Sequence, residues 1–471
     1  MNSDTILAFI CYFSLPLLIG FFASRAAKKT QDFALGQRSI NYWVTAISVQ
    51  ASDMSGWLFM GYPAIVFAHG CQKIWVALGL FTGMFLTWQL LAKKIRTETE
   101  KFNCRTLSSY FESRFEDKTG MVRISSAIFC LIFFTFYISS GLVEMGRLLE
   151  AITGIPYTIG VSLGVCVVLY SLFGGFVSMA WIDFFQGIFL LLMLMLVPYL
   201  AYMKVGGLEA IRETAHIKNI PLSFLPDSSL GTLRDILFSA LEWGLGYFGM
   251  PHILTKFMGL NDVSKMKRAQ YIGMSWQIIA LISASCVGLV GIAFFKEGLP
   301  RNELIFIHMV KELFPPFFAS LILCAVMAAA INVMGAQVLS SASIIAEDFY
   351  KKYFMKSAEA QLSGAKRLQN VSRACVLVIC ICAYASAFTT DKTIFSLVKY
   401  AWSGLGCTFG PVLLVALYTK VRHYSVALAG ILVGGTVGAL WPHDTFIPAM
   451  IAGYLASFFS MGTMQFLIKR A

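Results

Sequence analysis

The sequence predicts an all-α polytopic membrane protein with about 13 transmembrane helices, and two observations carry this prediction. Of its 471 residues, 58% are hydrophobic and only 13% are charged, whereas about a quarter are charged in a typical soluble domain. The apolar residues also fall into long runs, and a membrane-spanning helix needs roughly 20 of them. The net charge of +12 does not indicate a nucleic-acid partner, because the basic residues cluster in short connections between the apolar runs.

The apolar runs define the expected helices in order. They lie at 5–24, 43–67, 71–92, 122–149, 155–176, 181–203, 232–254, 271–295, 314–346, 372–390, 394–419, 424–441 and 445–468. The first run has no basic segment before it, and it is followed by Arg25, Lys28 and Lys29. This arrangement is typical of a spanning helix with its N-terminus outside rather than of a cleaved signal peptide.

The loop charges favour one orientation. If alternate loops lie inside, the inside loops hold about 24 of the 37 Lys and Arg residues and the outside loops about 8. We therefore expect a multi-pass protein of the bacterial cytoplasmic (inner) membrane, surrounded by lipid, with its N-terminus outside and its C-terminus inside. Its oligomeric state is not predicted by the sequence.

The sequence lacks the motifs that are typical of several function classes. The eleven Cys residues are scattered, mostly inside apolar runs, and neither a CxxC pair nor an HExxH motif occurs. The GxxxxGK[ST] motif of ATP-binding proteins does not occur, and the longest connections are too short for a soluble domain. We therefore expect no enzyme activity and no organic cofactor.

Two of the expected helices are interrupted by polar and small residues. The second contains "QASDMSGWLFMG" (50–61), and the seventh contains "SALEWGLGYFGMPH" (239–252). Each heads a block of five helices, 43–203 and 232–419, and an odd number gives the two blocks opposite orientations. Interrupted helices at corresponding places in inverted repeats point to a transporter's midplane site. The remainder is an extra N-terminal helix and loop (1–42), an extracellular loop (204–231) and two C-terminal helices (420–471).

The interrupted segments carry the candidate site residues. Asp53 is either an acid paired structurally with a neighbouring helix or part of a cation or substrate site, which is the default reading for an intramembrane acid. Trp57, Trp243 and Tyr247 belong either to an interfacial aromatic belt or to the walls of a small, apolar-faced ligand site. Glu242 lies about ten residues into its helix, where it is either a proton or charge carrier or a buried acid paired with a base.

Three other charged residues have simpler interpretations. Glu144 lies near the outer end of its helix, where we expect an interfacial acid paired with Arg147 at i+3. Asp183, near the inner start of the sixth helix, reads by itself as an interfacial charge. Lys399 reads as a side chain that snorkels toward a helix end.

Five strings together resemble the solute:sodium symporter family, and most of all its sodium/proline branch. They are ASDMSGWLFMG (51–61), FEDK (115–118), SLFGGF (171–176), WGLGYFGMPHIL (243–254) and YAWSGLGCTFGP (400–411). The resemblance extends over essentially the whole chain. It implies the leucine-transporter type of fold, in which two inverted five-helix repeats cross near the midplane with discontinuous helices 2 and 7.

The resemblance also implies roles for individual residues. Asp53 matches the family's essential acid for sodium-coupled binding, and the carbonyls of Ala51 and Met54 would ligate Na⁺ as a coupling ion. Asp183 matches an acid near the sodium site, and Arg38 matches a functional basic residue on the cytoplasmic side. The positions that would contact or shape a proline-like substrate site are Ser55, Gly56, Trp57, Tyr137, Trp243, Tyr247 and Pro251.

The match fails at the ninth helix. A hydroxyl pair that ligates sodium in the family aligns with Asn332 and Val333, so one hydroxyl is missing, although Ala329 still offers a carbonyl. Glu242 stands where proline symporters carry a small residue. These departures suggest the hypothesis that coupling has moved partly or wholly to H⁺, with Glu242 or Asp53 taking the proton.

The sequence therefore predicts a secondary active symporter that imports L-proline or a closely related small amino acid by alternating access. Sodium is the coupling cation implied by the resemblance, and a proton-coupled amino-acid or betaine transporter is the alternative. A transporter-like solute sensor without a signalling domain is a second alternative, and accumulation of labelled solute by vesicles would separate it from a transporter.

Overall fold

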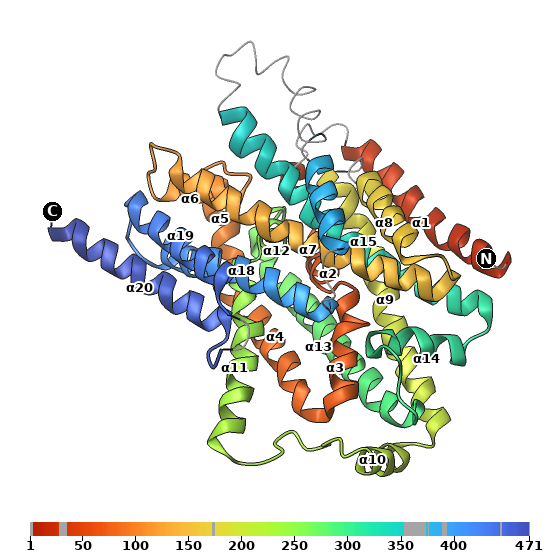
Figure 1. Ribbon diagram of the computed structural model, residues 1–471. Helices are drawn as coiled ribbons and strands as arrows, with labels where there is room; N and C mark the ends of the chain where they lie inside the picture. Colours follow the sequence, from red (N-terminus) through yellow and green to blue (C-terminus); the bar gives the residue numbers. More distant parts are fainter. Residues whose placement is uncertain are drawn as a thin grey trace.

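The computed structural model describes residues 3–27, 35–171, 175–352, 374, 376–388, 393–442 and 445–470. In these residues the chain is helical, apart from turns, loops and one isolated bridge between Ile40 and Leu260. The helices pack against one another as a single bundle, with the short helix α10 (Leu208–Ile217) lying across one end (Figure 1). The expected all-α class is confirmed for the described part of the chain.

The long helices follow the expected apolar runs. They are α1 (Ser3–Ala27), α4 (Ile74–Leu86), α7 (Met121–Thr153), α8 (Tyr157–Ser171), α9 (Gly175–Val205), α13 (Met266–Phe294), α15 (Pro316–Ile344), α18 (Ile394–Tyr418), α19 (Tyr424–Leu440) and α20 (Ala449–Arg470). By length and composition, seven helices in the described residues could cross a membrane. Thirteen were expected; several of the other runs form shorter or interrupted helices, and the runs 155–176 and 372–390 lie partly outside the described residues.

The expected second helix is interrupted. Helix α2 (Tyr42–Asp53) begins at Asn41, whose side chain accepts a hydrogen bond from the Val44 N–H, and ends at Asp53. Ser55 is extended and caps the short 3-10 turn η2 (Gly56–Leu58) by accepting from the Trp57 N–H. Helix α3 (Gly61–His69) then continues the chain. A serine followed by a glycine thus ends one half-helix and starts the next.

The expected seventh helix is interrupted in the same way. Helix α11 (Leu230–Gly246) runs into a 3-10 turn, η6 (Tyr247–Gly249), after which Met250 is extended. Pro251 then occupies the first position of α12 (Pro251–Met258), where its missing N–H leaves no hydrogen bond unmade. Both interruptions are enclosed, because every residue from Trp243 to Pro251 except Leu245 is buried.

Small residues let α11 approach α4 closely. A methyl group on Gly83 would lie 2.5 Å from the Gly244 Cα, so neither helix has room for a side chain there. Such contacts between small residues are typical of helix pairs in membranes. They hold the helix that carries the second interruption against α4.

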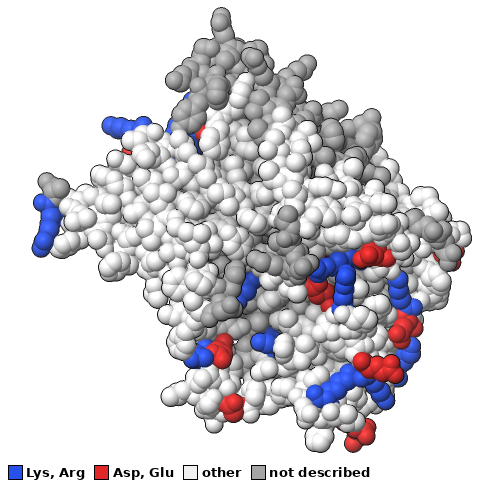
Figure 2. Space-filling view, viewed as in Figure 1, with Lys and Arg blue, Asp and Glu red and all other residues white. Residues whose placement is uncertain are grey.

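The surface has the character of a lipid-facing protein. Leu192, Ile282 and Phe459 are each more than half exposed, on α9, α13 and α20. The middle of the face in Figure 2 is almost without charge, and the Lys, Arg, Asp and Glu side chains gather toward its edges. This distribution fits a bilayer around the middle of the bundle.

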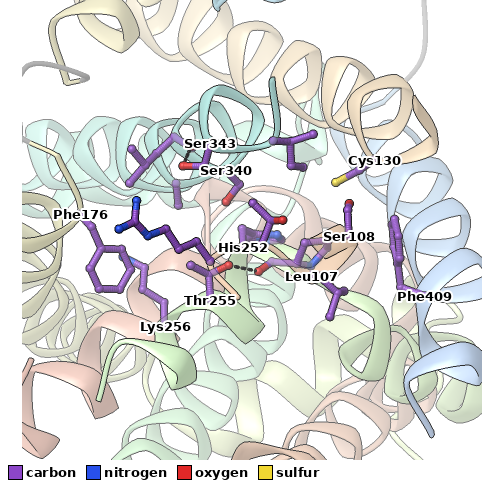
Figure 3. Close-up of a pocket in the computed structure, with 16 residues that line it drawn as sticks. Leu107, Ser108, Cys130, Phe176, His252, Thr255, Lys256, Ser340, Ser343 and Phe409 are labelled. Carbon is purple, nitrogen blue, oxygen red and sulfur yellow. Dashed lines mark hydrogen bonds between the residues drawn. The ribbon is translucent and has the colours of Figure 1, made fainter. Parts of the chain in front are cut away.

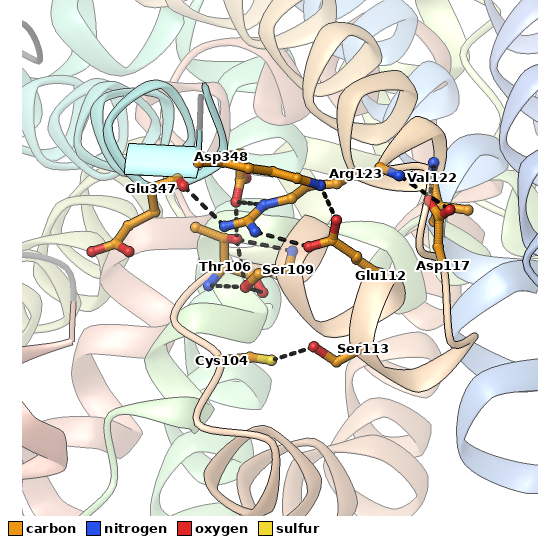
Figure 4. Close-up of polar contacts among 12 residues, drawn as sticks. Cys104, Thr106, Ser109, Glu112, Ser113, Asp117, Val122, Arg123, Glu347 and Asp348 are labelled. Carbon is orange, nitrogen blue, oxygen red and sulfur yellow. Dashed lines mark hydrogen bonds and ion pairs between the residues drawn. The ribbon is translucent and has the colours of Figure 1, made fainter. Parts of the chain in front are cut away.

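A polar cluster ties α6 (Leu107–Arg114) to α7 and to the π-helical turn η9 (Ile345–Lys351) that follows α15 (Figure 4). Arg123 donates to Asp348 at 2.7 Å, to Glu112 at 2.8 Å and to the Glu347 carbonyl at 2.9 Å. Thr106 adds a hydrogen bond to Asp348 at 2.8 Å. This cluster fixes the end of α15 relative to α7.

Candidate functional site

The two interruptions meet at one hydrogen bond. The Tyr247 hydroxyl of η6 donates to Asp53 Oδ2 at the end of α2 over 2.6 Å. Gln277 Nε2, from α13, donates in turn to the Tyr247 oxygen over 3.3 Å. Asp53, Tyr247 and Gln277 are each 1% exposed or less. The predicted residues Asp53 and Tyr247 are therefore brought together, 194 positions apart in the chain.

Aromatic rings form one wall beside this hydrogen bond. Trp57 stacks on Trp243 with ring centroids 5.8 Å apart, and Trp243 also packs against Phe395 at 5.0 Å. Trp402 of α18 meets the Tyr247 ring edge-on at 4.9 Å and donates its indole N–H to the Trp243 carbonyl. Trp57 and Trp243 are 2% exposed, so these rings are enclosed in the bundle and do not form an interfacial belt.

A second acid enters the first interruption. A methyl group on Gly56 would lie 2.8 Å from Glu144 Oε2 and still closer to the other two carboxyl atoms. The Gly56 N–H is a hydrogen-bond donor to this carboxylate. Glu144 is 1% exposed, and Oε1 is buried without a hydrogen-bond partner among the described residues. Glu144 therefore fills the space that glycine leaves at the interruption.

The expected Glu144–Arg147 pair is wrong. Arg147 instead forms an ion pair with Glu303, whose other oxygen accepts from the Ile394 N–H at 2.9 Å. The helical depth of Glu144 suggested an interface with water. However, the outer part of α7 is covered by the neighbouring helices, so depth along a helix does not give exposure.

Several other polar atoms converge on the same region without partners. The Tyr137 hydroxyl, both His252 ring nitrogens, Gln277 Oε1 and Asn332 Nδ2 are buried and make no hydrogen bond within the described residues. The Tyr137 ring meets the His252 ring edge-on at 5.8 Å. Buried polar groups are usually satisfied by protein, water or ligand, so this concentration indicates a polar ligand site.

A cavity reaches this region from one end of the bundle (Figure 3). It encloses about 550 Å³ of empty space, part of it open to solvent. Pro251, His252 and Lys256 of α12 line it, opposite Ser340 and Ser343 of α15. His252 lines this cavity and its ring also contacts the Tyr137 ring, so the cavity lies beside the buried polar groups of this region.

The predicted acid Asp183 has a resident cation. Asp183 Oδ2 accepts hydrogen bonds from Ser48 and Ser52 of α2 at 2.7 and 3.0 Å, and it forms an ion pair with Lys256 Nζ at 2.8 Å. The Asp183 and Lys256 side chains are 1% and 4% exposed. Asp183 therefore does not lie at an interface with water, and a buried lysine ammonium balances its charge.

The predicted ion ligands lie on α2 and α15, and these helices touch. The Met54 N–H bonds to the Gln50 carbonyl and the Ser55 N–H to the Asp53 carbonyl. The Ala51 carbonyl therefore lacks the Ser55 N–H that would be its helical partner, and it can accept another ligand. Ala329, Asn332 and Val333 are buried on α15, where Val333 supplies no oxygen.

Glu242 and Lys399 form an ion pair at 3.0 Å. Glu242 is therefore a buried acid paired with a base, as one of its two interpretations expected, and its role as a proton or charge carrier stays a prediction. Lys399 is 40% exposed and its ammonium group is directed to Glu242, so this side chain has an acidic partner that the snorkelling interpretation did not include. Only one end of this pair is buried.

Arg38 lies at the end of the bundle where α2 begins. It donates to the Met258 carbonyl at 2.7 Å, to the Cys104 carbonyl at 3.1 Å and to the Thr99 hydroxyl at 3.2 Å. These bonds tie the segment before α2 to the end of α12 and to the loop before α6. Arg38 thus holds both interrupted helices at the end where the cavity opens.

Sequence reasoning missed four residues of this region: Glu144, His252, Lys256 and Trp402. A signal was available for Glu144, because "SSGLVEMG" (139–146) places small residues beside it, and small residues indicate close packing of another backbone. Trp402 and His252 lie within strings already singled out. Nothing in the sequence alone pairs Lys256 with Asp183, which is 73 positions away.

Comparisons with known proteins agree with this geometry. The model of the sodium:solute symporter family matches residues 33–434. The chain is 39% identical to the high-affinity proline transporter PutP of Bacillus subtilis, covering 94% of each chain. It is 37% identical to the sodium/proline symporter of Escherichia coli, over 94% of this chain and 88% of that protein. A solved Na⁺-coupled sialic acid symporter has the same fold, with a TM-score of 0.81, 18% identity and coverage of 99% and 98%.

Proposed function

Because the chain belongs to the sodium:solute symporter family, we propose that it is a secondary active symporter for L-proline or a closely related small amino acid, coupled to a cation gradient. The hydrogen bond between Asp53 and Tyr247 carries the proposal, since it joins the two interrupted helices at a buried point. Interrupted helices that meet at mid-depth are where such transporters bind solute and ion. The names of the proline-transporting relatives support the substrate class.

The residues around this bond suit a small zwitterion. The solute's ammonium group would face Asp53, and an apolar ring would pack on Trp57 and Trp243 beside it. The Gly56 amide, at the start of η2, would face its carboxylate, because the start of a half-helix attracts negative charge. Tyr137, whose hydroxyl is buried without a partner in the described residues, would complete the site.

The sodium site implied by the family does not fit completely. On α2, the Ala51 and Met54 carbonyls would supply ligands. On α15, Ala329 and Asn332 could add oxygen atoms, but Val333 cannot, and a hard cation needs a full oxygen shell. The Asp183 charge is already balanced by Lys256. No step of the proposed cycle therefore runs through a bound sodium ion.

The position of the cavity supports alternating access. With the orientation that the loop charges favour, the cavity beside His252 and Lys256 is the inner vestibule, and the Arg147–Glu303 pair lies on the outer side. Release inward would need only the layer containing His252 and Tyr137 to move. The hydrogen bonds of Arg38 would keep the inner end closed until release. The blocks 43–203 and 232–419 would be the inverted repeats that rock against each other.

Uptake by proteoliposomes tests the proposal. Purified protein should accumulate radiolabelled proline above equilibrium when an inward cation gradient is imposed, and the gain should vanish when ionophores collapse the gradient. Unlabelled glycine betaine and other amino acids, added in excess, would define the substrate class. Binding of proline without accumulation or exchange would overturn transport and support a sensor.

A further inference from the structure

Glu144 is a buried acid at the solute site that the proposed function leaves without a role. It meets the Gly56 N–H at the place where an anionic solute group would bind. Neither an ion pair nor a hydrogen bond to Oε1 reaches it from the described residues. Burial of an ionised carboxylate without a cation is so costly that such a group is normally neutralised.

The other buried acids of the region are already compensated. Asp183 has the ammonium of Lys256, and Glu242 has the ammonium of Lys399. Asp53 accepts from the Tyr247 hydroxyl and would receive the ammonium of the solute. Of these four acids, Glu144 is thus the one that neither a resident cation in the described residues nor the ammonium of the solute neutralises.

The groups around Glu144 do not supply a positive charge. Glu303 carries the same sign and is held by Arg147. Glu144 meets the Gly56 backbone of η2 and interacts with the Tyr137 hydroxyl of α7 itself; nearby on α7, Gly146 packs against Tyr157 of α8 and Gly141 against Met334 of α15. A proton on the carboxylate is the smallest cation that this enclosed space can take.

We infer that Glu144 is the proton-carrying residue of the cycle, and that a proton on Glu144 replaces sodium as the coupling ion. The inference rests on the proposed function. A solute carboxylate and the Glu144 carboxylate compete for the same amide, so they repel each other when both are ionised. When Glu144 is protonated, its O–H donates a hydrogen bond to the solute carboxylate, and both can bind.

The proton balance of one cycle is simple. Outside water delivers one proton to a Glu144 carboxylate oxygen, and the solute binds beside the resulting O–H. After the site opens inward, the O–H bond breaks, the proton passes to water in the inner vestibule, and the solute leaves. Since each ligand strengthens binding of the other by the same factor, proton and solute move together.

The test uses full-length protein in proteoliposomes with radiolabelled proline. In sodium-free buffer with the membrane potential clamped at zero, each unit of pH difference, acid outside, should give about tenfold accumulation for one proton per solute. A sodium gradient at equal pH should give none. A pyranine dye inside the vesicles should report acidification when proline is added outside.

Glu144→Gln supplies the decisive variant, because it is a neutral isostere of the protonated acid. It should still exchange internal for external proline, at a rate that no longer depends on pH, since the neutral form is the one that binds solute. It should lose both pH-driven accumulation and the pyranine signal. Glu150→Gln, on the same helix but with a half-exposed side chain, is the matched control and should retain all three activities.

The outcomes are distinct. If Glu144→Gln still accumulates proline under a pH gradient, or if a sodium gradient alone drives accumulation in wild type, the inference is wrong. If wild type neither exchanges nor accumulates proline or any competing solute, the proposed function itself fails. If Glu144→Gln does not exchange, Glu144→Asp decides: it keeps a titratable acid, so restored pH-driven accumulation supports the inference and exchange without such accumulation overturns it.

Discussion

Replacing Gly56 with Ala tests the arrangement of the interruption directly. Gly56 does not have a positive φ, so alanine can adopt its backbone conformation, and only the space beside it is at issue. The new methyl group would lie 2.8 Å from Glu144 Oε2 and closer to Oε1 and Cδ, so the carboxylate must leave its place. Overpacking of this kind costs about 1–3 kcal/mol. Loss of the partner of a buried polar group costs about 1–3 kcal/mol more.

The expected total for Gly56→Ala is a loss of about 2–6 kcal/mol in apparent stability, measured as thermal unfolding in detergent. Glu144→Ala removes the clashing atoms, so the double variant should recover at least about 1 kcal/mol relative to the sum of the single variants. Gly462→Ala is the control, because nothing lies within 4 Å of a methyl group there. It should be neutral or slightly stabilising in α20. Additive losses in the Gly56–Glu144 pair would refute the contact.

Three further substitutions test other parts of the structure. Tyr247→Phe removes the donor to Asp53, so proline affinity measured by equilibrium binding should fall about tenfold, and an unchanged affinity would argue against a shared site. Lys399→Met should lower the thermal midpoint more than the double variant with Glu242→Gln, because the single change removes the cation beside a buried acid; equal losses would contradict the pair. Burial would raise the pKa of Asp117, but hydrogen bonds from Thr119, Gly120 and Val122 outweigh it and hold the pKa below its usual value. Its contribution is therefore present above about pH 4 and lost as pH falls further, so Asp117→Asn should lower the midpoint at pH 7 and lose this effect in acid.

The sequence alone was sufficient for the class of protein and for the two interruptions. Hydropathy shows which segments of the chain are apolar enough to cross a membrane. Glycine, serine and proline show where a helix ends. Asp53, Trp57, Trp243 and Tyr247 could be singled out because each lies beside an interruption. Their mutual contacts could not, since stacking of Trp57 on Trp243 depends on how helices 186 positions apart cross.

Charged residues were the least predictable part. Position along a helix gave Glu144 and Asp183 as interfacial, yet both are 1% exposed. A bilayer position predicts contact with water only for a residue on the outside of the bundle, and a tilted or covered helix breaks that relation. Pairing was equally hidden, because Lys256 and Lys399 reach their acids from other helices. An estimate of how deep a charged residue lies in the membrane should therefore be combined with a search for small residues beside it, because these allow another backbone to approach and cover it.

The buried acids near the interruption in α2 differ in how their negative charge is compensated, and this difference bears on coupling. A buried acid that is paired with a lysine has a structural role. The pair is neutral while it stays intact, so an ion from solution adds no stability to it. Asp183 and Glu242 are of this kind. An acid that must be neutralised from solution changes its energy each time its ligand comes and goes, and only such an acid can couple transport to a gradient. In the described part of the chain, Glu144 meets this condition at the amide that the solute also needs. Coupling then requires no long pathway, because the Glu144 carboxylate and the solute carboxylate meet at a single backbone N–H.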